Sequence, residues 1–122
     1  MAMSMTPAMQ AEIKILPGND RCVDCGGPHP QWASVTFGAL MCLECSGAHR
    51  GMGVHISFVR SVTMDSWNEK QLALMKGGGN ADLIAFWKKH GVDPRMPHNA
   101  KYHEPASELY KDRLRANVEG KP

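Results

Sequence analysis

The sequence predicts an α+β fold, in which a small four-cysteine module with a short three-stranded antiparallel sheet is surrounded by about five helices. Three observations predict it: the cysteines form two close pairs, strand-like segments lie between and just after these pairs, and most of the remaining chain has helical periodicity. With 122 residues, 43% hydrophobic and 21% charged, we expect a single globular domain, residues 1–122, with the module at about 22–65 and a helical remainder at about 66–119.

The first predicted element is a short helix that begins after Thr6. Thr6 is a favourable N-cap, and Pro7 suits the first helical position because its missing N–H costs nothing there. Pro17 and Gly18 should end the helix. Apolar residues at helical spacing predict its buried face: Met9, Ile13 and Leu16.

The next feature is the cysteine pattern C-x2-C-x16-C-x2-C, formed by Cys22, Cys25, Cys42 and Cys45. Two C-x2-C knuckles supply the four thiolates of a tetrahedral Zn²⁺ shell, so the pattern predicts a zinc finger with one zinc ion. Four thiolates leave no open position for water, and the metal should therefore be structural. Disulfides are the alternative, but the N-terminus lacks the features of a secretory signal, which favours metal. The spacing leaves iron open.

Strand-like segments are predicted at residues 32–37, 39–41 and 56–64. Gly38 should separate the first two into a hairpin that brings the two knuckles together. The third segment alternates, with Arg60 interrupting an otherwise apolar face. An arginine there must either extend its charged end to water or find a partner, and our hypothesis is that Arg60 hydrogen-bonds the backbone of the loop that carries Arg50. The apolar members of that face are Ile56, Phe58, Val62 and Met64.

Residues 43–51 should form a helix that starts on the second knuckle and ends at Gly51 and Gly53. Arg50 falls in its last turn. One interpretation is a surface arginine favoured by the helix dipole. The other is a guanidinium that a rigid, metal-anchored helix presents to a partner.

The rest of the chain is predicted to be helical. Ser66 and Glu69 have the spacing of a capping box for a helix to residue 76, and Asn80 should cap a second helix that ends at Gly91. A last helix should start near Pro105. One face of that helix is expected to contain Ala106, Leu109, Tyr110, the stem of Arg113, and Leu114.

The residues around the cysteines carry a resemblance. The run C-x2-C-x16-C-x2-C-S-G-x-H-R-x-x-G-V-H-I-S-x-V-R-S, closing on residues 63–67, is similar to the signature of the Arf GTPase-activating protein (ArfGAP) domain. The segments 30–32, 58–65 and 78–81 resemble the Golgi-associated branch of that family. The likeness covers about residues 8–120.

This resemblance implies that the chain is a GTPase activator. Arg50 would be an arginine finger, supplied in trans to GTP bound to an Arf-family small GTPase, while Trp32 and Asp65 would face that GTPase. The sequence alone leaves Trp32 open between a core position and a partner contact. The chain would need no nucleotide site of its own, and the triple glycine at residues 77–79 is not followed by the G-K-[ST] of a phosphate loop.

Two other functions stay open: an adaptor that binds a GTPase without activating it, and a nucleic-acid-binding zinc module. A net charge of +2, and no basic residue after Cys42 before His49 and Arg50, argue against nucleic acid. His29, His49 and His55 are expected to be structural or interface residues. No apolar run is long enough for a membrane span. The resemblance implies a cytoplasmic monomer that is recruited to Golgi membranes in vesicle-mediated transport.

Overall fold

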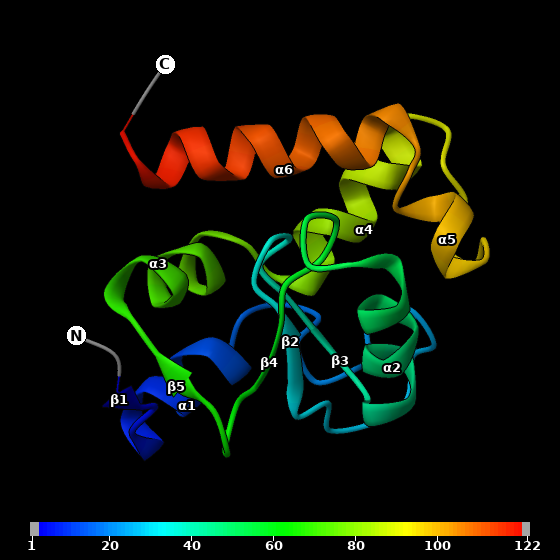
Figure 1. The fold of residues 1–122 in the computed structure, drawn as a ribbon. Coiled ribbons are helices and arrows are strands. Elements are labelled where there is room, and N and C mark those ends of the chain that lie inside the picture. The colour runs from blue at the N-terminus through cyan, green and yellow to red at the C-terminus, as the bar shows by residue number, and fades with distance from the viewer. Residues whose placement is uncertain (1–2, 121–122) are drawn as a thin grey trace.

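A computed structural model describes residues 3–120 (Figure 1). The chain forms two small antiparallel sheets, one of order β3-β2-β4 and one of order β1-β5, and six helices in the described part. The elements are β1 (Met3–Ser4), α1 (Pro7–Lys14), β2 (Trp32–Ser34), β3 (Ala39–Met41), α2 (Leu43–Met52), β4 (Val59–Ser61), β5 (Ser66–Trp67), α3 (Glu69–Gly77), α4 (Asn80–Lys89), α5 (His98–Lys101) and α6 (Pro105–Val118). The predicted α+β class is confirmed.

The three-stranded sheet has the predicted hairpin, but its first and third strands are shorter than expected. After β2, residues 35–38 turn, with Gly38 donating to the carbonyl of Val35, so the strand ends before Phe37. The third strand keeps only Val59–Ser61 of the predicted 56–64, because the backbone of Ile56 closes a turn onto Gly53. Met64, predicted on the apolar face, is 73% exposed.

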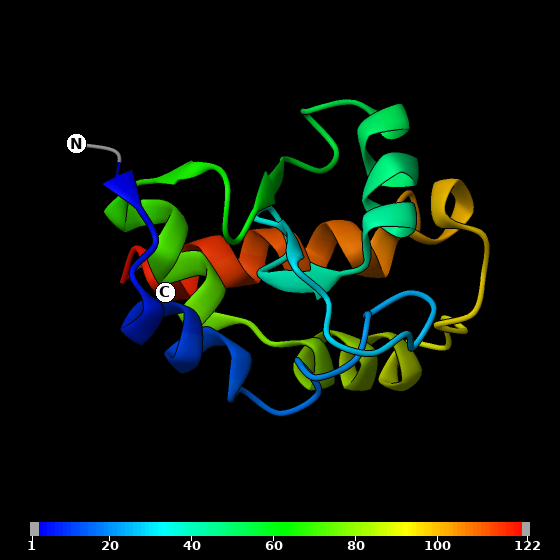
Figure 2. The ribbon, with the colours of Figure 1, turned by 90° about the horizontal axis from the view of Figure 1, so that it is seen from below.

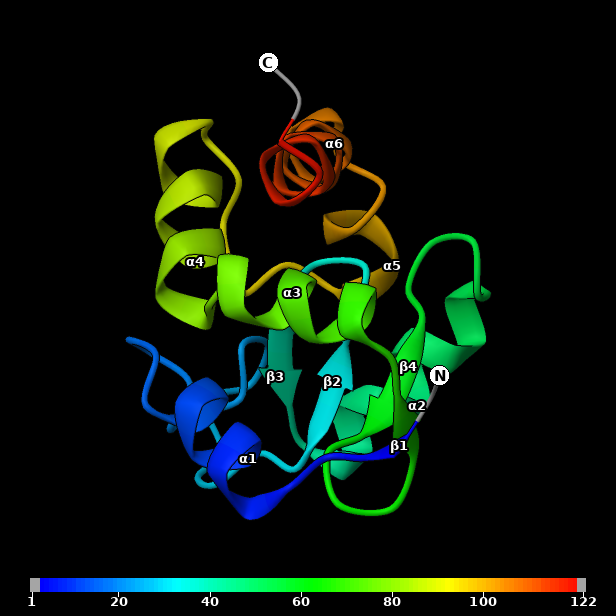
Figure 3. The ribbon, with the colours of Figure 1, turned by 90° about the vertical axis from the view of Figure 1, so that its left-hand side faces the viewer.

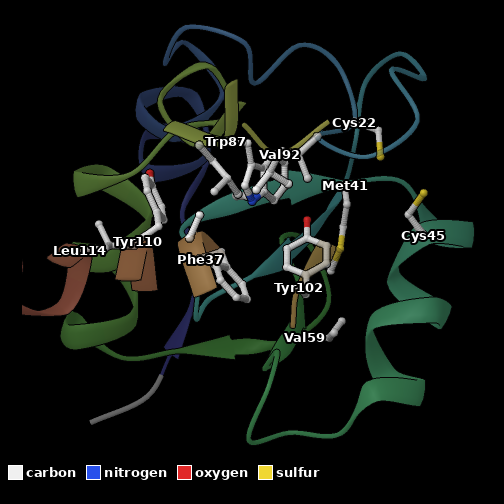
Figure 4. Close-up of a cluster of buried hydrophobic side chains, with 14 residues drawn as sticks. Cys22, Phe37, Met41, Cys45, Val59, Trp87, Val92, Tyr102, Tyr110 and Leu114 are labelled. Atoms are coloured by element: carbon white, nitrogen blue, oxygen red, sulfur yellow. The ribbon is translucent and has the colours of Figure 1, made fainter. Parts of the chain in front are cut away.

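Side chains alternate across this sheet into two apolar clusters. On one face, β3 and β4 contribute to a cluster with α4 and α6 that contains Phe37, Trp87, Tyr102 and Leu114 (Figure 4). The other face packs against α1, β5 and α3. In Figure 3, α4 and α6 lie above β2 and β3, and α1 lies at their lower left. The second cluster contains Met5, Ile13, Ala33, Val35, Leu40, Val62, Trp67, Leu72 and Met75.

The N-terminal helix begins as predicted but ends at Lys14, so Leu16, predicted on its buried face, lies beyond it. Thr6 caps α1 by accepting a hydrogen bond from the backbone N–H of Met9, at 3.2 Å, and Pro7 occupies the first turn. Ile13 is fully buried, whereas Met9 lies at the edge of the second cluster. The sequence did not predict the short helix α5 or the β1-β5 pair.

The predicted capping box at Ser66 is wrong by two residues. Asn68 accepts from the backbone N–H of Gln71 at 2.8 Å, and the Gln71 side chain accepts from the N–H of Asn68 at 3.0 Å. Ser66 and Trp67 are extended because they pair with β1, and the buried Trp67 indole donates to the carbonyl of Ser61. This long-range pairing moves the start of α3 to Glu69.

Asn80 is also not a helix cap, since it is the first residue of α4 and Gly79 precedes it as N-cap. Its fully buried side chain accepts from the N–H of Leu40 at 2.7 Å and donates to the carbonyls of Arg21 (2.7 Å) and Leu40 (2.8 Å). Its own N–H donates to the Asn19 side chain. Asn80 therefore joins α4 to β3 and to the start of the first knuckle.

Asn80→Ala is expected to lower the free energy of unfolding by roughly 2–4 kcal/mol, because it leaves the buried N–H of Leu40 without its acceptor and removes a donor from the carbonyls of Arg21 and Leu40. Chemical denaturation measures this. The exposed Asn117 on α6 is the matched control, and Asn117→Ala should change stability by no more than about 0.5 kcal/mol. Equal losses in the two variants would contradict the assignment.

The last helix begins at Pro105 as predicted, and Ala106, Tyr110 and Leu114 are buried. Leu109, predicted on the same face, is 45% exposed, so the buried stripe is narrower than expected. None of the helices that the structure describes combines the length and the apolar character needed to cross a bilayer.

Candidate functional site

The predicted four-cysteine cluster forms. One sulfur atom from each of Cys22, Cys25, Cys42 and Cys45 lies within 4.8 Å of the others. Figure 4 shows the sulfur atoms of Cys22 and Cys45 facing each other at the edge of the first apolar cluster. The cysteines come from the loop before β2 and from the start of α2, so the hairpin closes the two knuckles onto each other.

Backbone N–H groups surround these sulfur atoms. The N–H of Cys25 points at the sulfur of Cys22 (3.5 Å), that of Gly27 at the sulfur of Cys25 (3.4 Å), and that of Cys45 at the sulfur of Cys42 (3.4 Å). Such donors stabilise thiolates and orient them as ligands. Burial, together with the charge of Cys22, raises the pKa of the Cys45 thiol, so four thiolates at this spacing require a cation. The donor set therefore fits a tetrahedral zinc ion.

Helix α2 starts on this cluster and carries Arg50 in its last turn. Cys42 is the N-cap, which fixes the start of α2 to the second knuckle. The helix ends at Gly53, where φ is 101°, a conformation that glycine adopts without strain. Arg50 is exposed, whereas the neighbouring His49 is fully buried. The short rigid helix thus presents one guanidinium to solvent.

Arg50 lies over the indole ring of Trp32, with its Cζ atom 5.3 Å from the ring centroid. Trp32 is half-buried at the start of β2. A hollow of about 270 Å³ beside Arg50 is bounded by the loop after α2 and by β4, and it includes Val54 and Arg60. Arg50 therefore has two neighbours of interest: Trp32, whose ring it covers, and Arg60, with which it lines the hollow.

Arg60 does not make the predicted hydrogen bond to the Arg50 loop in the part of the chain that the structure describes. Its guanidinium lies over the Phe58 ring, 4.4 Å from the centroid, and its Nε is buried without a partner. Arg60 faces the same side of the sheet as Ala33, its neighbour on β2, so its stem packs while its head reaches the hollow.

Asp65 is half-buried and closes the turn after β4. Its Oδ2 accepts from the N–H of Ser61 at 2.7 Å, and its own N–H donates to the Ser61 carbonyl. This hydrogen bond uses one carboxylate oxygen, Oδ2, and holds the Asp65 side chain beside the end of β4.

The sequence analysis missed a buried charged group at Asp24. Its side chain, 2% exposed, contacts Lys101 Nζ at 2.6 Å, and it accepts hydrogen bonds from the Tyr102 hydroxyl and the His49 ring, both at 2.7 Å. His98 lies 3.6 Å away. The one sequence feature that could have indicated this group is an acidic residue between two predicted metal ligands. Its partners could not be predicted, because they come from helices far along the chain.

Burial alone would raise the pKa of Asp24. The hydrogen bond from His49 and the charge of Lys101 outweigh it and hold the pKa of that carboxyl well below its usual range. Burial and the Asp24 charge raise the pKa of the Tyr102 hydroxyl, which stays a donor. Asp24 is thus a fixed negative charge that joins the first knuckle to α2 and α5, which lie side by side in Figure 2.

Lys101→Met is expected to lower the free energy of unfolding by about 3–5 kcal/mol, because it leaves the buried Asp24 carboxylate without its cation. Thermal or chemical denaturation measures the loss. Lys76, which is half-exposed and lies 3.1 Å from Glu12, provides the control: Lys76→Met should cost no more than about 1 kcal/mol. If the two variants were equally stable, the buried ion pair would make no net contribution to the free energy of unfolding.

The fold and this site define a class: a four-cysteine zinc-finger domain that displays an arginine at the end of its metal-anchored helix. The family model "ArfGap: Putative GTPase activating protein for Arf" matches residues 7–119. The chain belongs to the ArfGap family, which confirms the resemblance seen in the sequence.

Several relatives are similar over most of this chain. The yeast protein "ADP-ribosylation factor GTPase-activating protein GCS1" (Saccharomyces cerevisiae) is 48% identical over 103 residues, which cover 84% of this chain and 29% of that protein. "ADP-ribosylation factor GTPase-activating protein 3" from Bos taurus is 46% identical over 105 residues, which cover 85% of this chain and 20% of the relative. The chain thus spans less than a third of the length of these relatives.

Solved structures have the same fold. The crystal structure of a "putative GTPase activating protein for ADP ribosylation factor" from Cryptosporidium parvum superposes with a TM-score of 0.75 at 33% identity, covering 93% of this chain and 87% of that one. The solution structure of the ArfGap domain of human RIP gives a TM-score of 0.63 over 98% of this chain and 87% of that one; at 24% identity it supports the fold alone.

Proposed function

We propose that this chain activates an Arf-family small GTPase by supplying Arg50 in trans to the bound GTP. The observation that carries the proposal is the exposure of Arg50 at the end of a helix fixed to the four-cysteine cluster, where its guanidinium lies over Trp32. Its neighbour His49 is anchored in the core, so the arginine projects from a rigid base.

The chemistry of GTP hydrolysis explains why one arginine is enough. The γ-phosphoryl group passes through a transition state with charge spread over its oxygens, and catalysis depends on positioning and charge stabilisation. A guanidinium stays charged and offers several fixed N–H donors to phosphate oxygens. The water-positioning residue belongs to the GTPase. A zinc ion held by the four cysteines would have a structural role, because it would join α2 to the first knuckle.

The partner surface that we propose contains Arg50, Trp32, Asp65 and Arg60. Trp32 offers an aromatic contact beside the finger, Asp65 offers a carboxylate at the edge of the sheet, and Arg60 contributes a second cation to the hollow. Arg60 lies beside Arg50 in the hollow, and we assign it a supporting role in which it helps to shape the surface around Arg50. Such a surface suits the GTP-bound GTPase. Following the sequence resemblance, a monomeric chain would act in the cytoplasm at Golgi membranes, in vesicle trafficking.

The test is single-turnover hydrolysis of GTP preloaded on a panel of Arf proteins, with and without this chain. A rate increase of at least about 10³-fold on one or more of them supports the proposal. Binding to GTP-loaded Arf without any rate increase would establish the adaptor function instead. No effect on hydrolysis and no binding would overturn the proposal altogether.

Trp32→Ala is expected to raise KM for GTP-loaded Arf by roughly 30-fold, because an aromatic contact at the centre of an interface commonly contributes about 2 kcal/mol. The measurement is the initial hydrolysis rate against Arf concentration. Leu109, 45% exposed on α6, is the control for loss of an exposed apolar side chain. If Leu109→Ala and Trp32→Ala behave alike, Trp32 does not face the GTPase.

A further inference from the structure

We infer that a buried chain of hydrogen bonds, running from Asp24 through His49 to Ser57, positions Arg50 for the reaction; this rests on the function proposed above. His49 Nε2 lies 2.7 Å from Asp24 Oδ2, and His49 Nδ1 lies 2.7 Å from Ser57 Oγ. Ser57 Oγ in turn lies 2.6 Å from the Ser34 hydroxyl. His49 and Ser34 are fully buried, and Ser57 is 1% exposed.

The donors and acceptors fit in one direction. The Asp24 carboxylate can only accept, so His49 carries a proton on Nε2 and donates it there. If Nδ1 carries no proton, it accepts from the Ser57 hydroxyl, which in turn accepts from Ser34. Every buried polar atom along this chain has a partner, and such fully bonded networks hold side chains in a single arrangement.

The network joins the segments that meet around Arg50. Asp24 lies in the first knuckle, His49 on α2, and Ser57 in the loop that leaves α2 and bounds the hollow. Ser34 lies on β2, the strand that also carries Trp32. Fixing these four side chains therefore fixes the helix, the loop and the strand relative to one another.

Arg50 follows His49 directly on α2, so their side chains leave the helix about 100° apart. An anchored His49 ring sets the rotation of α2 about its axis and with it the direction of Arg50. This part of the helix needs an anchor, because Gly51 and Gly53 follow Arg50 and glycine weakens a helix. Its last bond is from the N–H of Gly53 to the Arg50 carbonyl, at 3.2 Å.

The order carboxylate, imidazole, hydroxyl is also that of a hydrolase triad. Here, however, Asp24 bonds Nε2 and Ser57 bonds Nδ1, the reverse of that arrangement. The Ser57 hydroxyl is also bonded on its other side by Ser34, and the residue is 1% exposed. The geometry thus supports a positioning role and gives no nucleophile.

The experiment compares Ser57→Ala, Ser57→Thr and Ser107→Ala. Ser107 is a matched control: it is a fully buried serine on α6 whose hydroxyl also makes two hydrogen bonds, with Trp87 and with the Lys101 carbonyl, away from Arg50. Each variant is measured for zinc content, for kcat and KM with GTP-loaded Arf, and for backbone amide exchange at residues 50–53. All measurements are made at a temperature where every variant is folded.

Ser57→Ala should lower kcat by roughly 10–100-fold through misplacement of Arg50, with KM and zinc content unchanged. It should also speed amide exchange at residues 50–53. Ser57→Thr, which keeps the hydroxyl, should restore both, and Ser107→Ala should alter neither. Equal exchange at residues 50–53 in Ser57→Ala and Ser107→Ala would overturn the inference. An inactive native chain would refute the proposed function separately, and amide exchange would still decide the positioning role.

Discussion

Arg50→Lys is expected to lower the single-turnover rate of Arf-bound GTP hydrolysis by on the order of 10³-fold, because lysine keeps the charge but not the planar fork of donors. The change should leave the fold intact, since Arg50 is exposed and its polar contacts are with solvent and the Trp32 ring. Stopped-flow measurement of phosphate release, with the chain in excess over GTP-loaded Arf, gives the rate.

Arg113 on α6 is the matched control for this substitution. It is also exposed, and its Cζ lies 5.4 Å from the centroid of the Phe86 ring, much as Arg50 lies over Trp32. Arg113→Lys should therefore leave the rate within about twofold of the native chain, as expected of a surface change away from the site. Near-normal activity of Arg50→Lys would refute the arginine-finger assignment, whatever the control shows.

Cys22→Ala is expected to remove the metal and unfold the domain together. Structural zinc contributes roughly 10–16 kcal/mol in small peptides, which matches or exceeds the 5–15 kcal/mol that typically stabilises a whole domain. Cys22 is also buried in the first apolar cluster, so the metal site and the core are continuous. Elemental analysis of the purified chain and its circular dichroism spectrum measure both effects.

Val59→Ala separates loss of metal from loss of packing. Val59 is buried in the same cluster as Cys22, and its truncation should lower stability by roughly 1–3 kcal/mol while one zinc per chain remains. Adding a strong chelator to the native chain should reproduce the unfolding seen for Cys22→Ala. A chain that keeps its circular dichroism spectrum and its melting transition after complete metal removal would contradict a structural zinc.

The sequence predicts best the features that local chemistry determines. The spacing of the cysteines, the cap at Thr6 and the glycines after Arg50 specify the metal cluster, α1 and α2, and all three form as expected. In each, the residues that define the feature are close neighbours in the chain. Periodicity and caps report such neighbours directly.

The features that the sequence could not predict depend on contacts between distant segments. Ser66 is a residue type that often caps helices, but it pairs with β1 as part of strand β5. Asn68 is therefore the N-cap of α3. Asn80 looks like a cap and instead bonds Leu40, forty residues earlier. Asp24 meets Tyr102 across 78 residues. No periodicity or motif encodes these pairs.

The candidate site shows the same division. Arg50 and the four cysteines follow from spacing and from the resemblance, whereas the stacking of Arg50 on Trp32 requires the sheet to place β2 beside the end of α2. The predicted apolar row around Arg60 did not form, since β4 is short and buries Val59 and Ser61 instead, and Arg60 packs on Phe58 in place of the expected backbone hydrogen bond. The location of a long side chain's head depends on packing that sequence patterns do not specify.

The central claim is that Arg50 stabilises the transition state of GTP hydrolysis on another protein. It is tested most directly by affinity for a transition-state mimic, Arf bound to GDP and fluoroaluminate, compared with Arf bound to a non-hydrolysable GTP analogue. We expect the native chain to prefer the mimic by at least about 100-fold, and Arg50→Lys to lose that preference while keeping its affinity for the GTP-analogue form. An equal preference in the native and Arg50→Lys chains would contradict the account.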